Sequence, residues 1–325
     1  MTLTKDKAIS QINLLAERRE PFLFIADFNC EKNIVLPLNQ VDPKEILFNI
    51  NGSSNYSTEP QLDKGFELEK KPIAFEEFKK VFDLVHHQLK IGNSYLTNLT
   101  FTTPITCNHS LKEIFFRSKA KFKLWVKDQF VVFSPEIFLQ LKGHTITSFP
   151  MKGTIDASYE NARSSILANT KEMAEHVSIV DLIRNDMSIY ASNVRVDRFR
   201  YIDEVQTHEK KLLQVSSEIS GELDDRALKN IGEVVFSLLP AGSISGAPKH
   251  KTLEIIREVE NYKRGYYTGV FGVFDGNSLD SGVMIRFIEQ QKNGLVFKSG
   301  GGIHSLSDPK SEYQEMIDKV YVPIY

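Results

Sequence analysis

The chain has little cysteine, no long apolar run and almost no net charge, and each shortage excludes a class of protein. Only Cys30 and Cys107 occur in 325 residues, without a CxxC pair. This argues against a disulfide scaffold or a zinc knuckle and suits a reducing compartment. No apolar stretch approaches the roughly 20 residues that span a bilayer, and residues 1–19 lack a signal-peptide core. We therefore expect a cytoplasmic protein without a membrane partner.

The charge balance also argues against nucleic acid as a partner. The formal charge is −2 and the pI is about 6.5, so the chain has no global basic field. The sequence contains no GxxxxGK[ST] and no HExxH motif, and Gly242–Gly246 only mimics a nucleophile elbow because Ile244 stands at its centre. We therefore expect the partner to be a small molecule or another protein.

Hydrophobic periodicity predicts an α+β fold in one domain over residues 1–325. Apolar runs are separated by only two or three residues between 95 and 154, which permits only antiparallel pairing. The polar residues 51–72 read as a loop or excursion. Strands are expected at 95–101, 122–126, 130–134, 137–141, 145–149, 267–274, 282–289 and 295–298, with strands and turns over 21–50. Helices are expected at 1–19, 74–89, 159–185, 228–237, 249–261 and from Ser311 onward.

The segment Pro150–Thr154 carries a candidate nucleophile. Lys152 is fixed between a proline and a glycine after a run of strands. An amine in a partly dry pocket loses solvation and becomes able to attack carbon. The alternative is a surface turn with a solvated lysine, since most lysines are exposed.

Two pairs of glutamates form a candidate metal site. Glu172 and Glu175 lie three residues apart on one predicted helix, and Glu312 and Glu315 do so on the last helix. If the two faces converge, four carboxylates make an oxygen site that suits Mg²⁺. The alternative is ordinary surface glutamates, although the apolar residues around the first pair, Ala174 and Val177 among them, predict a largely buried helix.

Two glycine-rich segments are candidate anion sites. Lys298–Ile303 leaves a predicted strand through three glycines, and Pro240–Lys249 precedes a predicted helix whose N-terminus favours negative charge. Arg286, within an apolar strand, and Lys319, one turn beyond Glu315, are candidate carboxylate partners. The alternatives are simple turns and structural ion pairs.

These segments together resemble the chorismate-utilising enzymes, which include anthranilate synthase large subunits, aminodeoxychorismate synthase component I, and isochorismate and salicylate synthases. The matching pieces are Pro150–Thr154, Glu172–Asp186, Leu239–Glu260, Arg264–Phe274 and Ser299–Lys319. The resemblance implies a single chorismate-binding catalytic domain, with a reduced N-terminal part over 1–75 and a catalytic core over 76–325. It also implies large antiparallel sheets packed as a sandwich, with helices outside, as in the anthranilate synthase large subunit.

Lys152 places the resemblance closest to the aminodeoxychorismate synthase component I branch, since anthranilate synthases resemble this segment with a small residue there. The branch makes 4-amino-4-deoxychorismate for para-aminobenzoate and folate, through a lysine adduct at C2 of chorismate. Glu136 matches the acid/base glutamate of the family. By the same resemblance Mg²⁺ would bind Glu172, Glu175, Glu312 and Glu315. The carboxylates of chorismate would bind Thr154, Gly246, Ala247, Arg286, Gly300, Gly301, Gly302 and Lys319.

The resemblance also predicts a partner and leaves alternatives open. The chain shows no glutamine amidotransferase arrangement, so ammonia from glutamine would need a separate amidotransferase subunit. An anthranilate synthase large subunit and a catalytically silent chorismate-binding protein are the alternatives. Leu96, Leu213 and Val273 stand where many members carry a glutamine or lysine, a histidine and a tyrosine, which makes a divergent subgroup or altered chemistry possible.

Overall fold

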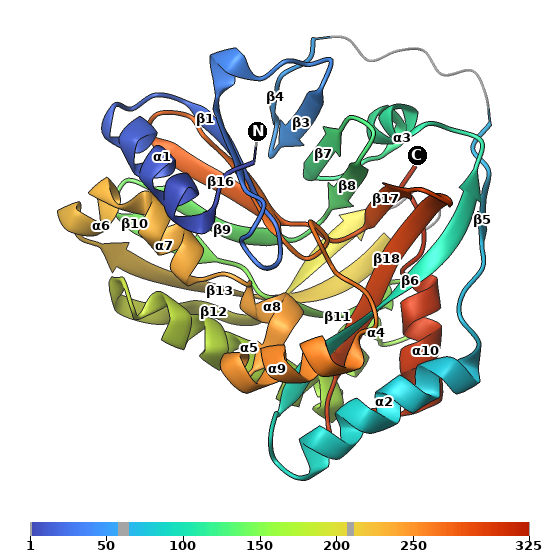
Figure 1. Cartoon of the computed structure of the whole chain (residues 1–325). Helices are drawn as coiled ribbons and strands as arrows, with labels where there is room; N and C mark the ends of the chain where they lie inside the picture. Colours follow the sequence, from blue (N-terminus) through green and yellow to red (C-terminus); the bar gives the residue numbers. More distant parts are fainter. Residues whose placement is uncertain (1, 58–64, 207–210, 325) are drawn as a thin grey trace. The chain divides into compact units, whose positions relative to one another are not determined.

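The chain folds into two compact units, each assembled from segments far apart in the sequence. The computed structural model describes residues 2–57, 65–206 and 211–324 (Figure 1). Unit 1 comprises Met1–Gln40, Glu136–Ser243 and Thr268–Val283, and unit 2 comprises Val41–Pro135, Ile244–Tyr267 and Met284–Tyr325. In the described residues each unit contains one nine-stranded sheet. The expectation of a single domain over 1–325, divided at about residue 75, stays a prediction.

The sheet of unit 1 is antiparallel at every pairing of its described strands. β1 is buried along its whole length, and the ring of Phe22 stacks on Phe274 of the neighbouring strand at 5.2 Å. A strand buried on both faces reads as a continuous apolar run, as this one does. In sheet order the strands are β11 (Met151–Asp156), β13 (Lys211–Leu223), β10 (Thr145–Ser148), β9 (Ile137–Lys142), β16 (Ser278–Val283), β15 (Val270–Phe274), β1 (Phe22–Ala26) and β2 (Ile34–Pro37), with β12 (Ala191–Gln206) on β13.

The helices of unit 1 differ from prediction at two points. The helix expected over 228–237 is two helices, Asp225–Lys229 and Ile231–Ser237, which are separated at Asn230. The single helix expected over 159–185 is two helices, because Asn169 ends the first and caps the second, where its side chain accepts a hydrogen bond from the Glu172 N–H at 3.1 Å. The helices are α1 (Lys5–Glu17), α4 (Ala162–Ala168), α5 (Thr170–Met187), α6 (Asp225–Lys229) and α7 (Ile231–Ser237), with a 3₁₀ turn η1 (Leu38–Gln40). α8 (Gly242–Ser245) begins in unit 1 and ends in unit 2.

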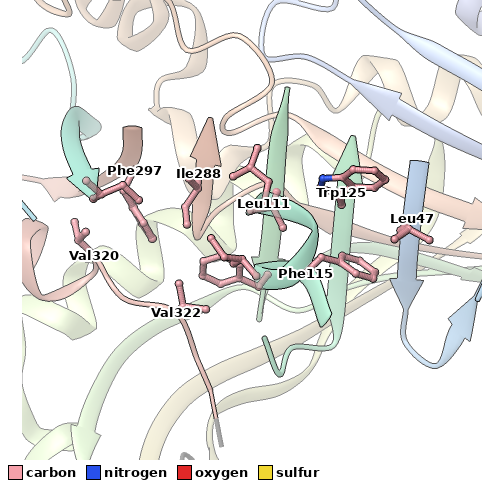
Figure 2. Packing of buried hydrophobic residues seen from close by; sticks show 12 residues of the cluster. Leu47, Leu111, Phe115, Trp125, Ile288, Phe297, Val320 and Val322 are labelled. Carbon is pink, nitrogen blue, oxygen red and sulfur yellow. The ribbon is translucent and has the colours of Figure 1, made fainter. Parts of the chain in front are cut away.

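The sheet of unit 2 is also antiparallel and packs around α3. Leu111 and Phe115 of α3 join side chains from the strands and from the C-terminal segment in one buried cluster (Figure 2). The cluster comprises Leu47, Ile105, Leu111, Ile114, Phe115, Trp125, Val131, Phe133, Ile288, Phe297, Val320 and Val322. In sheet order the strands are β14 (Gly246–Ala247), β6 (Leu96–Cys107), β18 (Gly294–Ile303), β17 (Phe287–Gln291), β8 (Phe130–Ser134), β7 (Phe122–Val126), β3 (Ile46–Ile50) and β4 (Ser53–Ser54), with β5 (Leu68–Lys70) on β6.

The helices of unit 2 follow the sequence pattern closely. α2 buries Phe78, Phe82, Val85 and Leu89, whose spacing of three and four residues makes one helical face. This confirms the helix expected over 74–89. The helices are α2 (Phe75–Lys90), α3 (Leu111–Arg117), α9 (Lys249–Val259) and α10 (Pro309–Asp318). In the part of the chain that the structure describes, none of the helices is both long and apolar enough to cross a membrane.

Candidate active site

Lys152 lies in an irregular part of β11, where the strand bulges. Met151 stands opposite Ser216 and Thr154 opposite Gln214, so β11 carries one more residue than β13 over this stretch. Gly153 has a φ of +82°, a conformation that favours glycine. The side chain of Lys152 is 15% exposed, and its Nζ lies 3.4 Å from Glu175 Oε2. The alternative of a solvated surface lysine is therefore wrong.

The first glutamate pair lies on α5, against this bulge. Glu175 is 6% exposed. A Cβ built on Gly153 would lie 3.2 Å from Glu172 Oε2, so the missing side chain leaves room for that carboxylate. Unit 1 thus brings Lys152, Glu172 and Glu175 together. The expected burial around them is wrong in part, because Val177 is 42% exposed. The side chain of Thr154 lies outside the described residues.

A buried histidine that sequence reasoning missed supports the same bulge. His176 follows Glu175, has no exposed surface, and places Nε2 2.6 Å from Ser217 Oγ. The Ser217 N–H donates to Pro150 O at 3.0 Å, and its Oγ accepts from the Arg200 N–H at 2.9 Å. Burial, and then the positive charges of Arg200 and Lys152, lower the pKa of His176 to about 4. The ring is therefore neutral at neutral pH. The sequence signal that could have identified it is its position directly after Glu175, a candidate metal ligand.

Glu136 belongs to unit 1 and directly precedes β9 in the chain. Its Oε1 accepts a hydrogen bond from the Ser243 hydroxyl, and its backbone carbonyl accepts from the Val283 N–H at 3.1 Å. Ser243 belongs to the glycine-rich segment expected to bind an anion. Its hydroxyl instead donates to a carboxylate, a partner that the sequence pattern did not indicate.

In unit 2 the three glycines of β18 remain in the sheet, which corrects the expectation that they leave it. Gly300, Gly301 and Gly302 pair with Thr100, Leu99 and Asn98 of β6. β17 pairs with β18 only as far as Lys298, so the glycine stretch has one described sheet neighbour. The amide and carbonyl of a strand residue point to the same side. The Gly300 carbonyl accepts from Lys319 and so points away from β6. The amides of Gly300 and Gly302 therefore also face away from β6, toward the open side of β18.

The second glutamate pair meets this stretch through α10. A Cβ built on Gly301 would lie 3.4 Å from Glu315 Oε1, 3.6 Å from Lys319 Nζ and 3.7 Å from Glu312 Oε2. Lys319 donates to Glu315 Oε1 at 2.6 Å and to the Gly300 carbonyl at 2.9 Å. Glu312 is 4% exposed, and its Oε1 accepts from the Ser307 hydroxyl at 2.7 Å. Unit 2 thus brings Gly301, Glu312, Glu315 and Lys319 together.

Arg286 lies outside regular structure, although it was expected within a strand. It falls between β16 and β17 and has a φ of +53°. The guanidinium carbon lies 5.2 Å from the centre of the Tyr321 ring, and Nε is buried without a hydrogen-bond partner among the described residues. A cation stacked on an aromatic face keeps its N–H groups for an anion. This geometry suits a carboxylate ligand.

Gly246 and Ala247 form β14, a short strand pressed against β6. Gly246 has a φ of +133°, and a Cβ there would lie 1.9 Å from the Leu96 carbonyl oxygen, so only glycine fits. The Ala247 carbonyl accepts from the Tyr95 N–H at 2.7 Å and from the Ser94 hydroxyl at 3.0 Å. These contacts fix the start of α9.

A buried ion pair next to β6 was also missed by sequence reasoning. Arg264 and Glu260 have side chains 2% exposed and are joined twice, with Nε and Nη2 at 2.8 and 2.6 Å from the carboxylate oxygens. Arg264 also donates to the carbonyls of Ile244 and Asn98. Asn98 pairs with Gly302 in the sheet. The pair therefore holds in register the segments that carry Gly246 and Gly302.

The carboxylates of each unit fit a divalent cation. The ligand atoms of both pairs are carboxylate oxygens. Gly153 leaves room in front of Glu172, and Gly301 leaves room in front of Glu312 and Glu315. A lysine contacts one carboxylate of each pair. Mg²⁺ prefers such oxygen ligands, keeps several waters and is often held by one or two carboxylates. Among the described residues no group of three or more His, Cys, Asp or Glu side chains forms a metal cluster. The four-carboxylate magnesium site stays a prediction.

Comparison with known proteins decides the family. Residues 26–324 match the model of the chorismate binding enzyme family. The chain belongs to this family.

Three proteins illustrate what this chorismate binding enzyme is similar to. It is 48% identical to an uncharacterised PabA-like protein of Pasteurella multocida over 317 residues, and this matched region covers 97% of this chain and 98% of the relative. It is 36% identical over 269 residues to aminodeoxychorismate synthase component 1 of Bacillus subtilis, covering 77% and 55%. MenF, the menaquinone-specific isochorismate synthase of Escherichia coli, has a similar fold, with a TM-score of 0.72 and 15% identity over 97% of this chain and 80% of that one. The resemblance and the α+β antiparallel fold class are confirmed.

The three positions at which the resemblance led us to expect polar side chains are buried and apolar. Leu213 pairs with Ile155 of β11 and is 3% exposed, Val273 is 4% exposed, and Leu96 is 2% exposed beside Ala247. Aliphatic side chains transfer no proton, so Leu96, Leu213 and Val273 cannot act as an acid or a base.

Proposed function

We propose that this chain is the chorismate-aminating component of an aminodeoxychorismate synthase, which makes 4-amino-4-deoxychorismate from chorismate and ammonia. The observation that supports this most is the setting of Lys152. Its side chain is largely buried and lies at a bulge of β11, and its amine is 3.4 Å from the Glu175 carboxylate. A 36% identical relative is named aminodeoxychorismate synthase component 1.

The reaction proceeds in two displacements. The Lys152 nitrogen bonds to C2 of chorismate, the C4–O bond breaks, and Glu136 gives the departing hydroxyl a proton, so that water leaves. Ammonia then bonds to C4, and the C2–N bond breaks to release the lysine amine. Only an uncharged amine has the lone pair for the first step, so the pair with Glu175 has to open and a proton has to leave before Lys152 attacks.

The residues of unit 2 would bind the carboxylates of the substrate. Arg286 offers a guanidinium, and Gly300 and Gly302 offer open-side amides. Lys319, Gly246, Ala247, Gly301 and Thr154 are the other proposed contacts. Mg²⁺ held by Glu172, Glu175, Glu312 and Glu315 would supply a Lewis acid for the ring carboxylate.

We also propose a separate glutamine amidotransferase as the source of ammonia in this folate-pathway reaction. An amidotransferase needs a reactive thiolate. Burial raises the pKa of the Cys30 thiol to about 11, and burial also raises the pKa of Cys107. Neither cysteine of the chain therefore suits glutamine hydrolysis.

The test is product analysis with chorismate, Mg²⁺ and ammonium at mildly alkaline pH. We expect a product about one mass unit lighter than chorismate, because NH₂ replaces OH, and no free pyruvate. Lys152→Ala should abolish this product. Lys142→Ala, at an exposed lysine of β9, is the matched control and should keep full activity. Anthranilate with pyruvate, or an active Lys152→Ala variant, would contradict the proposal.

A further inference from the structure

Ser217 of β13 lies beside two interruptions of the sheet in unit 1. On one side is the bulge of β11 at the candidate nucleophile. On the other side Arg198 and Tyr201 of β12 stand opposite Glu218 and Ser216, so β12 also carries one more residue than β13. A bulge leaves its extra residue unpaired in the ladder. Both strands next to Ser217 therefore need contacts besides the regular ladder to keep their positions.

The hydroxyl and the amide of Ser217 supply such contacts to both strands. Arg200 lies within the β12 bulge with a φ of +48°. A buried backbone N–H needs an acceptor, and the Arg200 N–H donates to Ser217 Oγ at 2.9 Å. On the other side the Ser217 N–H donates to the Pro150 carbonyl at 3.0 Å. Since Pro150 lies two residues before Lys152, Ser217 also holds the strand that carries the candidate nucleophile.

His176 connects Ser217 to the helix that carries Glu175. α5 packs against β11, β12 and β13, and His176 Nε2 lies 2.6 Å from Ser217 Oγ. Neither side chain has any exposed surface, so water does not compensate for the loss of this hydrogen bond. Glu175 directly precedes His176 in α5, and its Oε2 lies 3.4 Å from Lys152 Nζ. The hydrogen bond therefore joins α5 to β13 next to the residue whose carboxylate contacts the amine.

We propose that His176 is a positioning residue, which through Ser217 sets the distance between the Glu175 carboxylate and the Lys152 amine. The proposal rests on the proposed function. His176 acts on α5 and Ser217 on the start of β11, so a change in their contact moves the two groups relative to each other. A misplacement of about 1 Å can cost about a hundredfold in rate. The role concerns turnover rather than substrate binding, because the proposed contacts to the substrate carboxylates belong mostly to unit 2.

Two substitutions at His176 test this role, because they differ only in how far the side chain reaches. Glutamine brings an amide to about the place of Nε2, and an amide can donate or accept a hydrogen bond. Asparagine carries the same amide on a side chain one methylene shorter, which does not reach Ser217. We expect His176→Asn to lower kcat by about tenfold to a hundredfold and His176→Gln to keep most of it, with the KM for chorismate unchanged in both. An equal kcat in the two variants would overturn the proposal.

Ser217→Ala breaks the same hydrogen bond from the other side, and it takes the place of His176→Asn if that variant does not fold. It should lower kcat by about the same factor, and adding His176→Asn to it should lower kcat no further. Ser220→Ala is the matched control and should keep full activity, because Ser220 is a buried serine of the same strand whose hydroxyl donates to Asp197. Full activity of Ser217→Ala, or a further loss in the double variant, would overturn a role through Ser217.

Hydrogen exchange separates this proposal from the proposed function, because it needs no turnover. If the wild type forms no aminated product, the proposed function fails, and the amides of β11 still report how firmly that strand is held. Their exchange should be about tenfold faster or more in His176→Asn and Ser217→Ala, and as in the wild type in His176→Gln and Ser220→Ala. β1 of the same unit is the reference, since a general loss of stability speeds exchange in both strands. Unchanged exchange of β11 in His176→Asn and Ser217→Ala, or equal acceleration in β1, would overturn the proposal.

Discussion

His176 makes the stability of the chain depend on pH, and the size of the effect follows from its surroundings. The folded-state pKa is about 4, whereas an unfolded histidine titrates near about 6.5. Between these values the unfolded state binds more protons, so the stabilisation is complete above the unfolded pKa and is lost as the pH falls toward the folded pKa. A difference of about 2.5 pKa units corresponds to about 3 kcal/mol in full. Between about pH 7.5 and about pH 5 the loss is about 2 kcal/mol.

The assay is urea unfolding at these two pH values. Other groups also titrate there, so the informative quantity is the change in free energy of unfolding between the two pH values, compared among variants. His176→Gln should reduce that change by about 2 kcal/mol. The control is His250→Gln, because the His250 side chain is 92% exposed, and it should leave the change as in the wild type. An equal pH dependence in His176→Gln and the wild type would refute the reasoning.

Two further predictions concern a buried charge and a strand glycine. Glu260→Gln leaves its arginine partner buried without a carboxylate and should lower the free energy of unfolding, measured in urea, by about 3–5 kcal/mol. Glu258→Gln, at an exposed position of α9 two residues earlier, should change it by less than about 0.5 kcal/mol. Equal effects of the two variants would contradict a stabilising buried ion pair. Gly153→Ala and Gly143→Ala both place alanine at positive φ and should each cost about 1–2 kcal/mol. Only the first puts a Cβ against Glu172, so loss of chorismate turnover should follow from Gly153→Ala alone, and equal turnover in the two variants would refute a role for that contact.

Much of the fold could be predicted because the strands are short, apolar and closely spaced. The strands expected at 122–126 and 130–134 are β7 and β8 without a change of boundary. Gaps of two or three residues permit only antiparallel neighbours, and the structure has them in β7–β8 and β9–β10. The equally short gap between β8 and β9 instead joins the two sheets, and β10 and β11 both pair with β13. The strand expected from Tyr95 continues as far as Cys107, through alternating polar residues that weakened the apolar signal.

The longest strand pair was missed, and its composition explains why. β12 contains Arg195, Asp197, Arg198 and Arg200 among its apolar residues, and its pairing with β13 shifts register three times. Charges and bulges hide a period of two. The alternation of Val194 and Val196 with polar neighbours was the available signal.

The candidate site was predictable as a set of residue types but not as an arrangement. In each unit a strand glycine leaves room for glutamates of a helical pair, Gly153 for Glu172 and Gly301 for Glu312 and Glu315. A lysine contacts one glutamate of each pair, at 3.4 Å for Lys152 and Glu175 and at 2.6 Å for Lys319 and Glu315. Sequence spacing identified the glutamates, because helical periodicity is local. It could not show that a lysine already occupies one carboxylate of each pair, because that contact joins separate elements. A divalent cation at either pair therefore has to compete with a lysine, and in unit 1 that lysine is the proposed nucleophile. The same carboxylate would then control both metal binding and the release of the amine, which links the two parts of the proposed chemistry through Glu175.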